Sequence, residues 1–295
     1  MKKSGIAHTK DMLNRHALRV KKQYGQNFLL DQNILDKIVK TAAITPATTV
    51  IEIGPGLGAL TGALLETGAT VIAYEIDGDF IPLLKEHFAG PTFHLIHDDV
   101  LKRDLDADLT TLVLDPKDVV VVANLPYYIT TPILMQCLEE TTRIDRMVVM
   151  MQLEVAKRVS ASTNTKAYNA LSLAVQYRAI TRFAFKVPRQ VFMPAPHVDS
   201  GVVTLEFTDI HRQAVVDEPF FFTFIKQAFA QRRKTLLNNL QAWLLLDKGI
   251  LIEWLESQGV SPQIRAEALE LKTMINLANF FYKQLEKTSG DNDDT

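Results

Sequence analysis

The chain has 295 residues, of which 47% are hydrophobic and 22% charged, with a formal net charge of −2, as in soluble globular proteins of one or two domains. Its single cysteine, Cys137, excludes an internal disulfide and indicates a reducing compartment. No apolar run reaches the roughly 18 residues of a membrane span, and the basic residues 1–25 lack a secretory apolar segment, so we expect a cytoplasmic protein.

Short apolar runs alternate with stretches of helical spacing from residue 45 to about residue 207. In chain order, strands are predicted at 48–54, 70–77, 93–99, 119–124, 146–152 and 200–207. Helical spacing lies between them at 59–68, 80–88 and 131–140. Strands separated by helices predict a mostly parallel, doubly wound α/β sheet.

From residue 209 onward the spacing of apolar residues is helical throughout. Within it, we interpret the run 224–244 as one helix with an apolar side and a basic side. We therefore expect a sheet domain over residues 1–208, which includes a basic N-terminal segment, and a small all-helical domain over 209–287. The polar, acidic residues 288–295 are expected to form a disordered tail.

Charge is unevenly distributed along this nearly neutral chain. Residues 1–25 contain seven Lys or Arg and one Asp, and residues 143–190 contain nine basic and two acidic residues. Residues 66–118 contain twelve acidic and four basic residues. A basic face attracts phosphate backbones, so this segregation favours a nucleic-acid partner. Solvated helix faces are an equal alternative on charge alone.

The run VIEIGPGLGALT joins a predicted strand to a predicted helix through Gly54, Gly56 and Gly58. In a doubly wound sheet this turn lies where ligands bind, and glycine lets the backbone approach a ligand closely. Glu75, at the end of the next strand, is placed to accept hydrogen bonds from a ribose diol. The G-x-G-x-G spacing differs from the dinucleotide fingerprint, so a nucleoside-containing cofactor is one reading and a structural turn the other.

Further polar residues lie at the ends of other predicted strands. Glu52 precedes the glycine turn, and Asp99, at the end of the third strand, is placed to bind the adenine end of a cofactor. Asp98 beside it is a weaker candidate. The valine-rich strand 119–124 ends in Asn124, followed by Leu-Pro-Tyr-Tyr. This run predicts either a binding loop or a simple strand-to-helix turn.

EIGPGLG, YEID, HDD and NLPY together resemble the class I S-adenosylmethionine-dependent methyltransferases that act on adenine N6. Residues 25–39, 192–200 and 229–240 are similar, within that class, to the ribosomal RNA adenine dimethyltransferases of the bacterial KsgA type. The resemblance covers residues 8 to 285 and implies a Rossmann-like class I fold with a small C-terminal all-α domain. It implies S-adenosyl-L-methionine as cofactor, with no metal.

The resemblance also implies which residues hold that cofactor. Gln26 belongs to the Q-N-F-L motif, which helps to close the site; a polar helix start is the other reading of this motif. With the glycines and strand-end acids, the cofactor-binding set is Gln26, Asn27, Leu29, Glu52, Gly54, Gly56, Gly58, Glu75, Asp99 and Asn124.

The N-L-P-Y motif implies the catalytic residues. The side-chain oxygen of Asn124 and the carbonyl of Leu125 are expected to hold the two hydrogens of the adenine amino group and orient N6 towards the methyl donor. Pro126 stiffens the loop, and Tyr127 offers a ring on which the base stacks. Phe192, in a proline-rich loop, is expected to clamp the base from the other side. We assign no general base, and Tyr128 is interpreted as packing.

The substrate that the resemblance implies is a pair of adjacent adenosines in the 3′-terminal hairpin loop of small-subunit ribosomal RNA. The expected partner is the immature 30S subunit, and the expected state is a monomer. The residues expected to contact RNA phosphates are Lys157, Arg158, Arg232, Arg233 and Lys234. Leu153 stands where the family commonly has a lysine, which removes one such contact.

Other functions remain open at this point. A related large-subunit adenine methyltransferase of the macrolide-resistance type shares the glycine loop, and a ribosome-assembly factor without catalysis would share the basic surface. A DNA adenine methyltransferase is disfavoured because those enzymes usually carry an acid at the position of Asn124. The glycine spacing disfavours a nicotinamide dehydrogenase.

Overall fold

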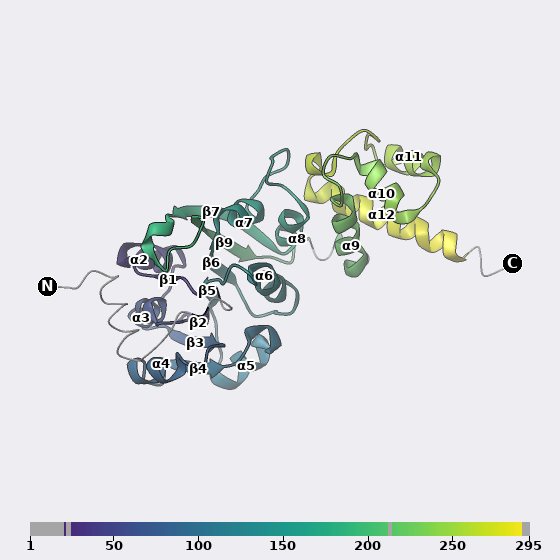
Figure 1. The fold of residues 1–295 in the computed structure, drawn as a ribbon. Coiled ribbons are helices and arrows are strands. Elements are labelled where there is room, and N and C mark those ends of the chain that lie inside the picture. Colours follow the sequence, from purple (N-terminus) through teal and green to yellow (C-terminus); the bar gives the residue numbers. More distant parts are fainter. Residues whose placement is uncertain (1–20, 22–24, 212–213, 291–295) are drawn as a thin grey trace. The chain divides into compact units, whose positions relative to one another are not determined.

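The computed structural model describes residue 21, residues 25–211 and residues 214–290 (Figure 1). Contacts divide the chain into two compact units, one containing residues up to 157 and 180–207, the other 158–179 and the residues from 208 onward. The chain passes into the second unit for the last time after residue 207. The predicted domain boundary, after residue 208, lies one residue from this point. The segment 158–179, assigned from the sequence to the sheet domain, groups instead with the helical unit.

Seven strands form one sheet in the described part of the first unit. Their order is β4-β3-β2-β5-β6-β9-β7. The strands are β2 (Thr49–Ile53), β3 (Thr70–Glu75), β4 (Phe93–His97), β5 (Val119–Asn124), β6 (Arg146–Gln152), β7 (Ala179–Val187) and β9 (Ser200–Phe207). The first five pair in parallel, and β9 runs antiparallel to β6. The doubly wound sheet is confirmed.

Burial explains which strands the sequence reveals. Every residue of β2 is buried, and so are the four valines and Ala123 of β5, because helices cover both faces of the sheet. Each buried valine contributes roughly 1.5–3 kcal/mol. β7 was missed because it lies at the sheet edge and exposes Ile180, Arg182 and Phe183, so it has no continuous apolar run.

Helices cover the two faces of this sheet, with α2, α3 and α4 on one side and α5 and α6 on the other (Figure 1). The helices of this region are α2 (Gln32–Thr41), α3 (Ala59–Leu65), α4 (Ile81–His87), α5 (Leu105–Leu112), α6 (Thr130–Glu139) and α7 (Leu153–Val159). Short 3₁₀ turns occur at η2 (Val100–Lys102) and η3 (Arg189–Val191). No helix in the described ranges combines the length and apolar character that a bilayer crossing requires.

A two-stranded sheet joins two distant motifs of the first unit. β1 (Phe28–Leu29) pairs antiparallel with β8 (Phe192–Met193), so that Leu29 lies opposite Phe192. The N–H of Leu30 extends the ladder by donating to the carbonyl of Val191 over 3.0 Å. This pairing places the Q-N-F-L segment beside the proline-rich loop.

The second unit is helical. Its elements are α8 (Ala170–Arg178), α9 (Glu218–Ala228), α10 (Leu236–Leu244), α11 (Lys248–Ser257), η5 (Ala266–Ala268) and α12 (Leu271–Gly290). Phe221, Phe224 and Phe281 are fully buried in its core. α12 extends into the predicted tail as far as Gly290, and residues 291–295 lie outside the described residues.

The prediction of one helix over residues 224–244 is wrong. α9 ends at Ala228, and α10 starts only at Leu236, after Thr235 has capped it by accepting the N–H of Asn238. Asn239 donates its side-chain amide to the carbonyls of Ala228 and Gln231 over 2.7 and 3.2 Å, which holds the connection in place. The basic run 232–234 is therefore on a loop between two helices.

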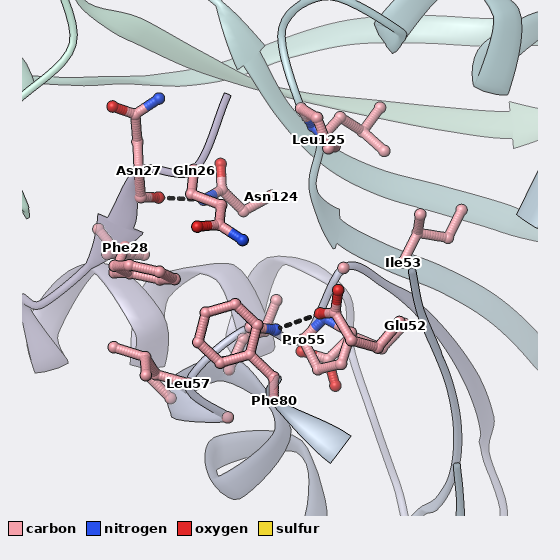
Figure 2. Close-up of a pocket in the computed structure, with 18 of the residues that line it drawn as sticks. Gln26, Asn27, Phe28, Glu52, Ile53, Pro55, Leu57, Phe80, Asn124 and Leu125 are labelled. Atoms are coloured by element: carbon pink, nitrogen blue, oxygen red, sulfur yellow. Dashed lines mark hydrogen bonds between the residues drawn. The ribbon is translucent and has the colours of Figure 1, made fainter. Parts of the chain in front are cut away.

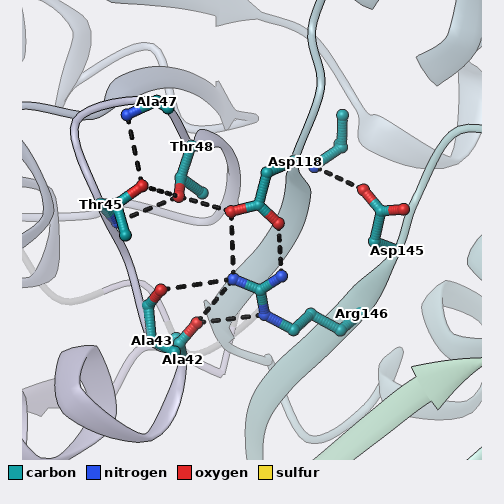
Figure 3. Close-up of polar contacts among 9 residues, drawn as sticks. Ala42, Ala43, Thr45, Ala47, Thr48, Asp118, Asp145 and Arg146 are labelled. Atoms are coloured by element: carbon teal, nitrogen blue, oxygen red, sulfur yellow. Dashed lines mark hydrogen bonds and ion pairs between the residues drawn. The ribbon is translucent and has the colours of Figure 1, made fainter.

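A polar cluster ties the amino-terminal ends of three strands together. Arg146, at the start of β6, forms an ion pair with Asp118 and donates to the carbonyl of Ala42 (Figure 3). Thr48 Oγ1 donates to Asp118 over 2.6 Å. The Arg146 guanidinium, with help from Thr48, lowers the pKa of Asp118 despite its partial burial. This cluster lies at the edge of the sheet opposite the carboxyl ends of the strands.

Arg146→Met is expected to lower the free energy of unfolding by roughly 1–3 kcal/mol, because it removes the cation paired with Asp118 and leaves the carbonyl of Ala42 without its donor. The folded pKa of Asp118 is lowered, so the ion pair stabilises above the unfolded pKa, near 3.9, and its contribution is lost as pH falls. Thermal melts should therefore show a larger deficit at neutral pH than at about pH 3. A variant as stable as the wild type at neutral pH would contradict this.

Candidate functional site

A cavity of about 840 Å³ opens at the carboxyl ends of the parallel strands (Figure 2). It is lined by the glycine turn after β2, the ends of β3 and β5, the start of η2, and residues 25–30. All ten predicted cofactor residues line it, and so do Asn124, Leu125, Pro126 and Tyr127. The structure brings them together because carboxyl ends of neighbouring parallel strands meet at one edge.

The glycine turn requires glycine at two positions for different reasons. Gly58 has φ +79°, and a Cβ there would lie 2.4 Å from the ring of Phe88. Gly54 has φ +71° and no atom within 4 Å of where its Cβ would be, so the backbone faces open space. A ligand can therefore approach the main chain here, as the sequence predicted.

Glu75 connects the glycine turn to the end of β3. One of its carboxylate oxygens accepts the N–H of Gly56 over 2.9 Å, and the other accepts the N–H of Asp77 over 2.8 Å. The side chain is nearly buried, and burial raises the pKa of this carboxyl against those two hydrogen bonds. Each oxygen keeps a further acceptor site for a ligand hydroxyl.

Glu52 is buried at the floor of the cavity with half of its carboxylate unpaired. Oε2 accepts the hydroxyl of Thr61 over 2.7 Å, whereas Oε1 has no hydrogen-bond partner among the described residues. Burial raises the pKa of Glu52 to about 8; the hydrogen bond from Thr61 opposes this and the charge of Glu75 adds to it. A buried acceptor without a partner suits the cationic or N–H group of a ligand.

Asp77 is a structural residue of the site that the sequence reading did not select. It accepts hydrogen bonds from Lys21 Nζ over 2.6 Å and Gln26 Nε2 over 2.8 Å. Burial alone would raise the pKa of Asp77, but the hydrogen bonds from Lys21, Asp79 and Gln26 lower it. Gln26 therefore anchors the segment before β1 to the end of β3, which is how it shapes the cavity.

The N-L-P-Y loop is held by contacts at both ends. Asn124 Nδ2 donates to the carbonyl of Asn27 over 3.1 Å, which leaves its Oδ1 as an acceptor (Figure 2). The N–H of Leu125 donates to Met150 of β6, and the carbonyl of Pro126 accepts the hydroxyl of Thr130 at the start of α6. The loop is thus fixed before any substrate binds.

Two of three aromatic residues lie differently from the sequence prediction. Tyr127 lines the cavity, and its hydroxyl is 2.6 Å from Ser200 Oγ. Phe192 is 3% exposed, packs in the hydrophobic core and does not line the cavity, so its role as a clamp stays a prediction. Tyr128 is not a packing residue: it is 53% exposed and lines the cavity.

The residues predicted to contact RNA are all exposed. Lys157 lies on α7, with Arg158 next to it. In the helical unit, Arg232, Arg233 and Lys234 lie on the loop between α9 and α10, where Arg232 Nε donates to Glu267 over 3.1 Å. Among the described side chains, no group of three or more His, Cys, Asp or Glu is arranged to hold a metal ion.

Residues 17–283 match the family model described as ribosomal RNA adenine dimethylase. The chain belongs to this family. The dimethylase is 48% identical over 278 residues to the ribosomal RNA small subunit methyltransferase A of Lactococcus lactis, covering 94% of this chain and 95% of that protein. It is 47% identical to the protein of the same name from Streptococcus pneumoniae, over 92% and 95% of the two chains.

Solved structures resemble the dimethylase in fold. A dimethyladenosine transferase from Plasmodium falciparum matches with a TM-score of 0.70 and 25% identity, over 85% of this chain and 95% of that one. The 23S rRNA methyltransferase ErmE matches with a TM-score of 0.64 and 24% identity, over 86% and 98%. The Rossmann-like class I methyltransferase fold and an adenine dimethyltransferase activity on ribosomal RNA, both expected from the sequence, are confirmed.

Proposed function

We propose that this dimethylase methylates N6 of two adjacent adenosines in the 3′-terminal hairpin loop of small-subunit ribosomal RNA, twice each, during 30S subunit biogenesis. S-adenosyl-L-methionine supplies the methyl group, on a sulfonium that becomes neutral when the methyl leaves. The observation that carries the chemistry is the position of Asn124. Its Nδ2 is held by Asn27 at the edge of the cavity, so Oδ1 is oriented as an acceptor.

The residues that line the cavity match the groups of such a cofactor. Glu75 would hold the ribose hydroxyls through its carboxylate lone pairs, and Asp99, two residues after β4, would hold the adenine end. The unpaired Oε1 of Glu52 suits the cationic methionine end. Phe28 and Phe80, whose rings meet edge-on with centroids 5.7 Å apart, add an apolar wall.

Asn124 and Leu125 activate the substrate by orienting it. The lone pair of an adenine amino group is delocalised into the ring, which makes N6 a poor nucleophile. Oδ1 of Asn124 and the carbonyl of Leu125 accept the two amino hydrogens, which favours the sp³ geometry and stabilises positive charge developing on nitrogen. That charge makes the departing proton acidic, so no strong base is needed. Tyr127 supports the flipped base by stacking.

The choice of the small subunit rests on the relatives. Those 48% and 47% identical are small subunit methyltransferases A, matched over nearly their full length. The likeness to ErmE, at 24% identity, concerns the fold alone. A purely non-catalytic assembly role is disfavoured by a cavity in which a buried carboxylate has no partner of its own among the described residues.

The test is a methylation assay with radiolabelled S-adenosylmethionine and small subunits that lack N6 methylation, with large subunits in parallel. We expect the label in dimethyladenosine at two adjacent positions of the 3′-terminal hairpin. Label in large-subunit RNA alone would refute the proposal that small-subunit RNA is the substrate. Absence of label from both RNAs would refute the proposed enzymatic function.

Glu52→Gln is expected to raise the melting temperature, with a gain that grows as pH rises. The folded pKa of Glu52 is raised to about 8, whereas an unfolded glutamate titrates near 4.3, so folding retains a proton that unfolding releases. Stability from this group is complete below about pH 4.3 and is lost as pH rises to about 8. Glutamine still accepts from Thr61 but carries no charge.

The same variant separates stability from binding. Because the ionised carboxylate suits a cationic ligand, the affinity of the wild type for S-adenosylmethionine should rise as pH rises towards about 8. The affinity of Glu52→Gln should be lower than that of the wild type and should not change with pH over this range. Glu66→Gln, exposed at the end of α3, is the control and should match the wild type. Parallel profiles for the wild type and Glu52→Gln, in melts and in titration calorimetry, would refute both expectations.

A further inference from the structure

A second, shallower cavity of about 570 Å³ opens on the surface of the first unit. It lies between the start of α7 and the two ends of the proline-rich loop that leads into β9. We refer to it as the loop groove. Its basic side chains are Lys157, Arg189 and His197, all exposed, and its acidic side chains are Glu154 and Asp199.

Hydrogen bonds brace the loop that forms this groove. Asp199 accepts the N–H of Arg189 over 3.0 Å and forms an ion pair with Lys186 over 2.7 Å. These contacts lower the pKa of Asp199, with Lys186 as the main cause, so its charge is already compensated. Its carbonyl also accepts the N–H of Leu153 at the start of α7. The two walls of the groove are therefore joined.

Cationic donors remain available inside the groove. Arg189 uses Nη1 to donate to the carbonyl of His197 over 3.0 Å, which orients the guanidinium and leaves most of its five donors for a ligand. Lys157 forms no ion pair within the described part of the chain, and it lines the groove from α7. An arginine fork beside a lysine suits phosphate oxygens.

The loop groove adjoins the cavity that holds the reacting base. Asp199 of the groove precedes Ser200, and Ser200 Oγ lies 2.6 Å from the hydroxyl of Tyr127, which lines the cavity. One residue step and one hydrogen bond thus separate the two sites. An RNA strand that places an adenosine at Asn124 can therefore reach the groove by passing Tyr127.

We propose that the loop groove binds the phosphodiester backbone of the RNA strand adjacent to the target adenosine, with Arg189 and Lys157 as its cationic contacts. This inference rests on the proposed function. The groove is open rather than enclosed, as a passing strand requires, and its positive side chains complement the phosphates. Arg189 and Lys157 are positioning residues: they hold the strand and do not touch the reacting atoms.

The test is the double variant Arg189→Gln/Lys157→Gln, assayed with unmethylated small subunits at several salt concentrations. We expect KM for the subunit to rise by roughly 10-fold, with kcat and cofactor affinity close to wild type, and the salt dependence of binding to weaken by about 0.7 per lost phosphate contact on a log–log plot. The single variant Arg189→Lys keeps the positive charge but not the guanidinium fork, so its KM for the subunit should lie between those of the wild type and the double variant.

Lys117→Gln is the matched control, since Lys117 is 78% exposed just before β5, at the opposite edge of the sheet. It removes one positive charge, as each substitution of the double variant does, and should leave KM unchanged. A double variant with wild-type KM and salt dependence, or one in which only kcat falls, would refute the proposal that the loop groove binds the RNA backbone. Either result would leave the proposed function intact. Wild-type protein that fails to label small subunits would overturn both.

Discussion

Asn124→Ala is expected to lower kcat for methyl transfer by roughly 10²–10³-fold, the range found when one preorganised hydrogen-bonding group is removed from an active site. The side chain links Asn27 to the cavity through its Nδ2, and its Oδ1 is the proposed acceptor for the adenine amino group. Alanine removes both contacts. Single-turnover assays with saturating cofactor and subunits measure the methyl-transfer step directly.

Asn124→Asp tests which half of the amide matters. Aspartate keeps an acceptor oxygen but, when ionised, cannot donate to the carbonyl of Asn27. We expect it to retain more activity than alanine and to bind the cofactor more weakly than the wild type. An alanine variant with full activity would refute the assigned mechanism, and one that merely unfolds is recognised by its melting temperature.

Glu75→Ala is expected to weaken S-adenosylmethionine binding by roughly 100-fold, because hydrogen bonds to charged groups contribute about 1.5–3 kcal/mol each. The loss has two sources. The ribose hydroxyls lose their acceptor, and the N–H groups of Gly56 and Asp77 lose theirs, so the glycine turn is no longer held against β3. Titration calorimetry with S-adenosylmethionine measures the change.

Glu66→Ala serves as the comparison, since Glu66 is an exposed glutamate at the end of α3 that does not line the cavity. It should bind the cofactor like the wild type. If Glu75→Ala bound as tightly as Glu66→Ala, the cavity would not be the cofactor site in the orientation proposed here.

The two units differ in how well local patterns predicted them. The parallel strands were located to within two residues at each end. Four of them are buried on both faces, which requires largely apolar runs, and β4, which is partly buried at the sheet edge, still has Phe93, Leu95 and Ile96. β7 was not predicted, because only one of its faces is covered and its sequence has no continuous apolar run. The break between α9 and α10 was not predicted either. Thr235 caps the start of α10 and the Asn239 amide binds the last carbonyl of α9, and helical periodicity does not reveal such side-chain contacts.

The edge of the sheet at which the cavity lies was also predictable, for a topological reason. Glycines after one parallel strand and polar residues after its neighbours must meet, whatever the details of packing. Gly54, Glu75, Asp99 and Asn124 accordingly line one cavity. Phe192 was expected there as well, but a two-residue strand pairing buries it opposite Leu29. No local pattern distinguishes a phenylalanine in such a pair from one in a binding loop.

By itself, the sequence determined the doubly wound fold, the edge of the sheet at which the cavity opens and the residue types gathered there. Only the tertiary structure decided how those residues are held: Gln26 against Asp77, 51 positions away, and Asn124 against Asn27, 97 positions away. The physical reason is range. Periodicity and turn chemistry act over a few residues, whereas these hydrogen bonds form only after the strands and the segment around β1 have packed together.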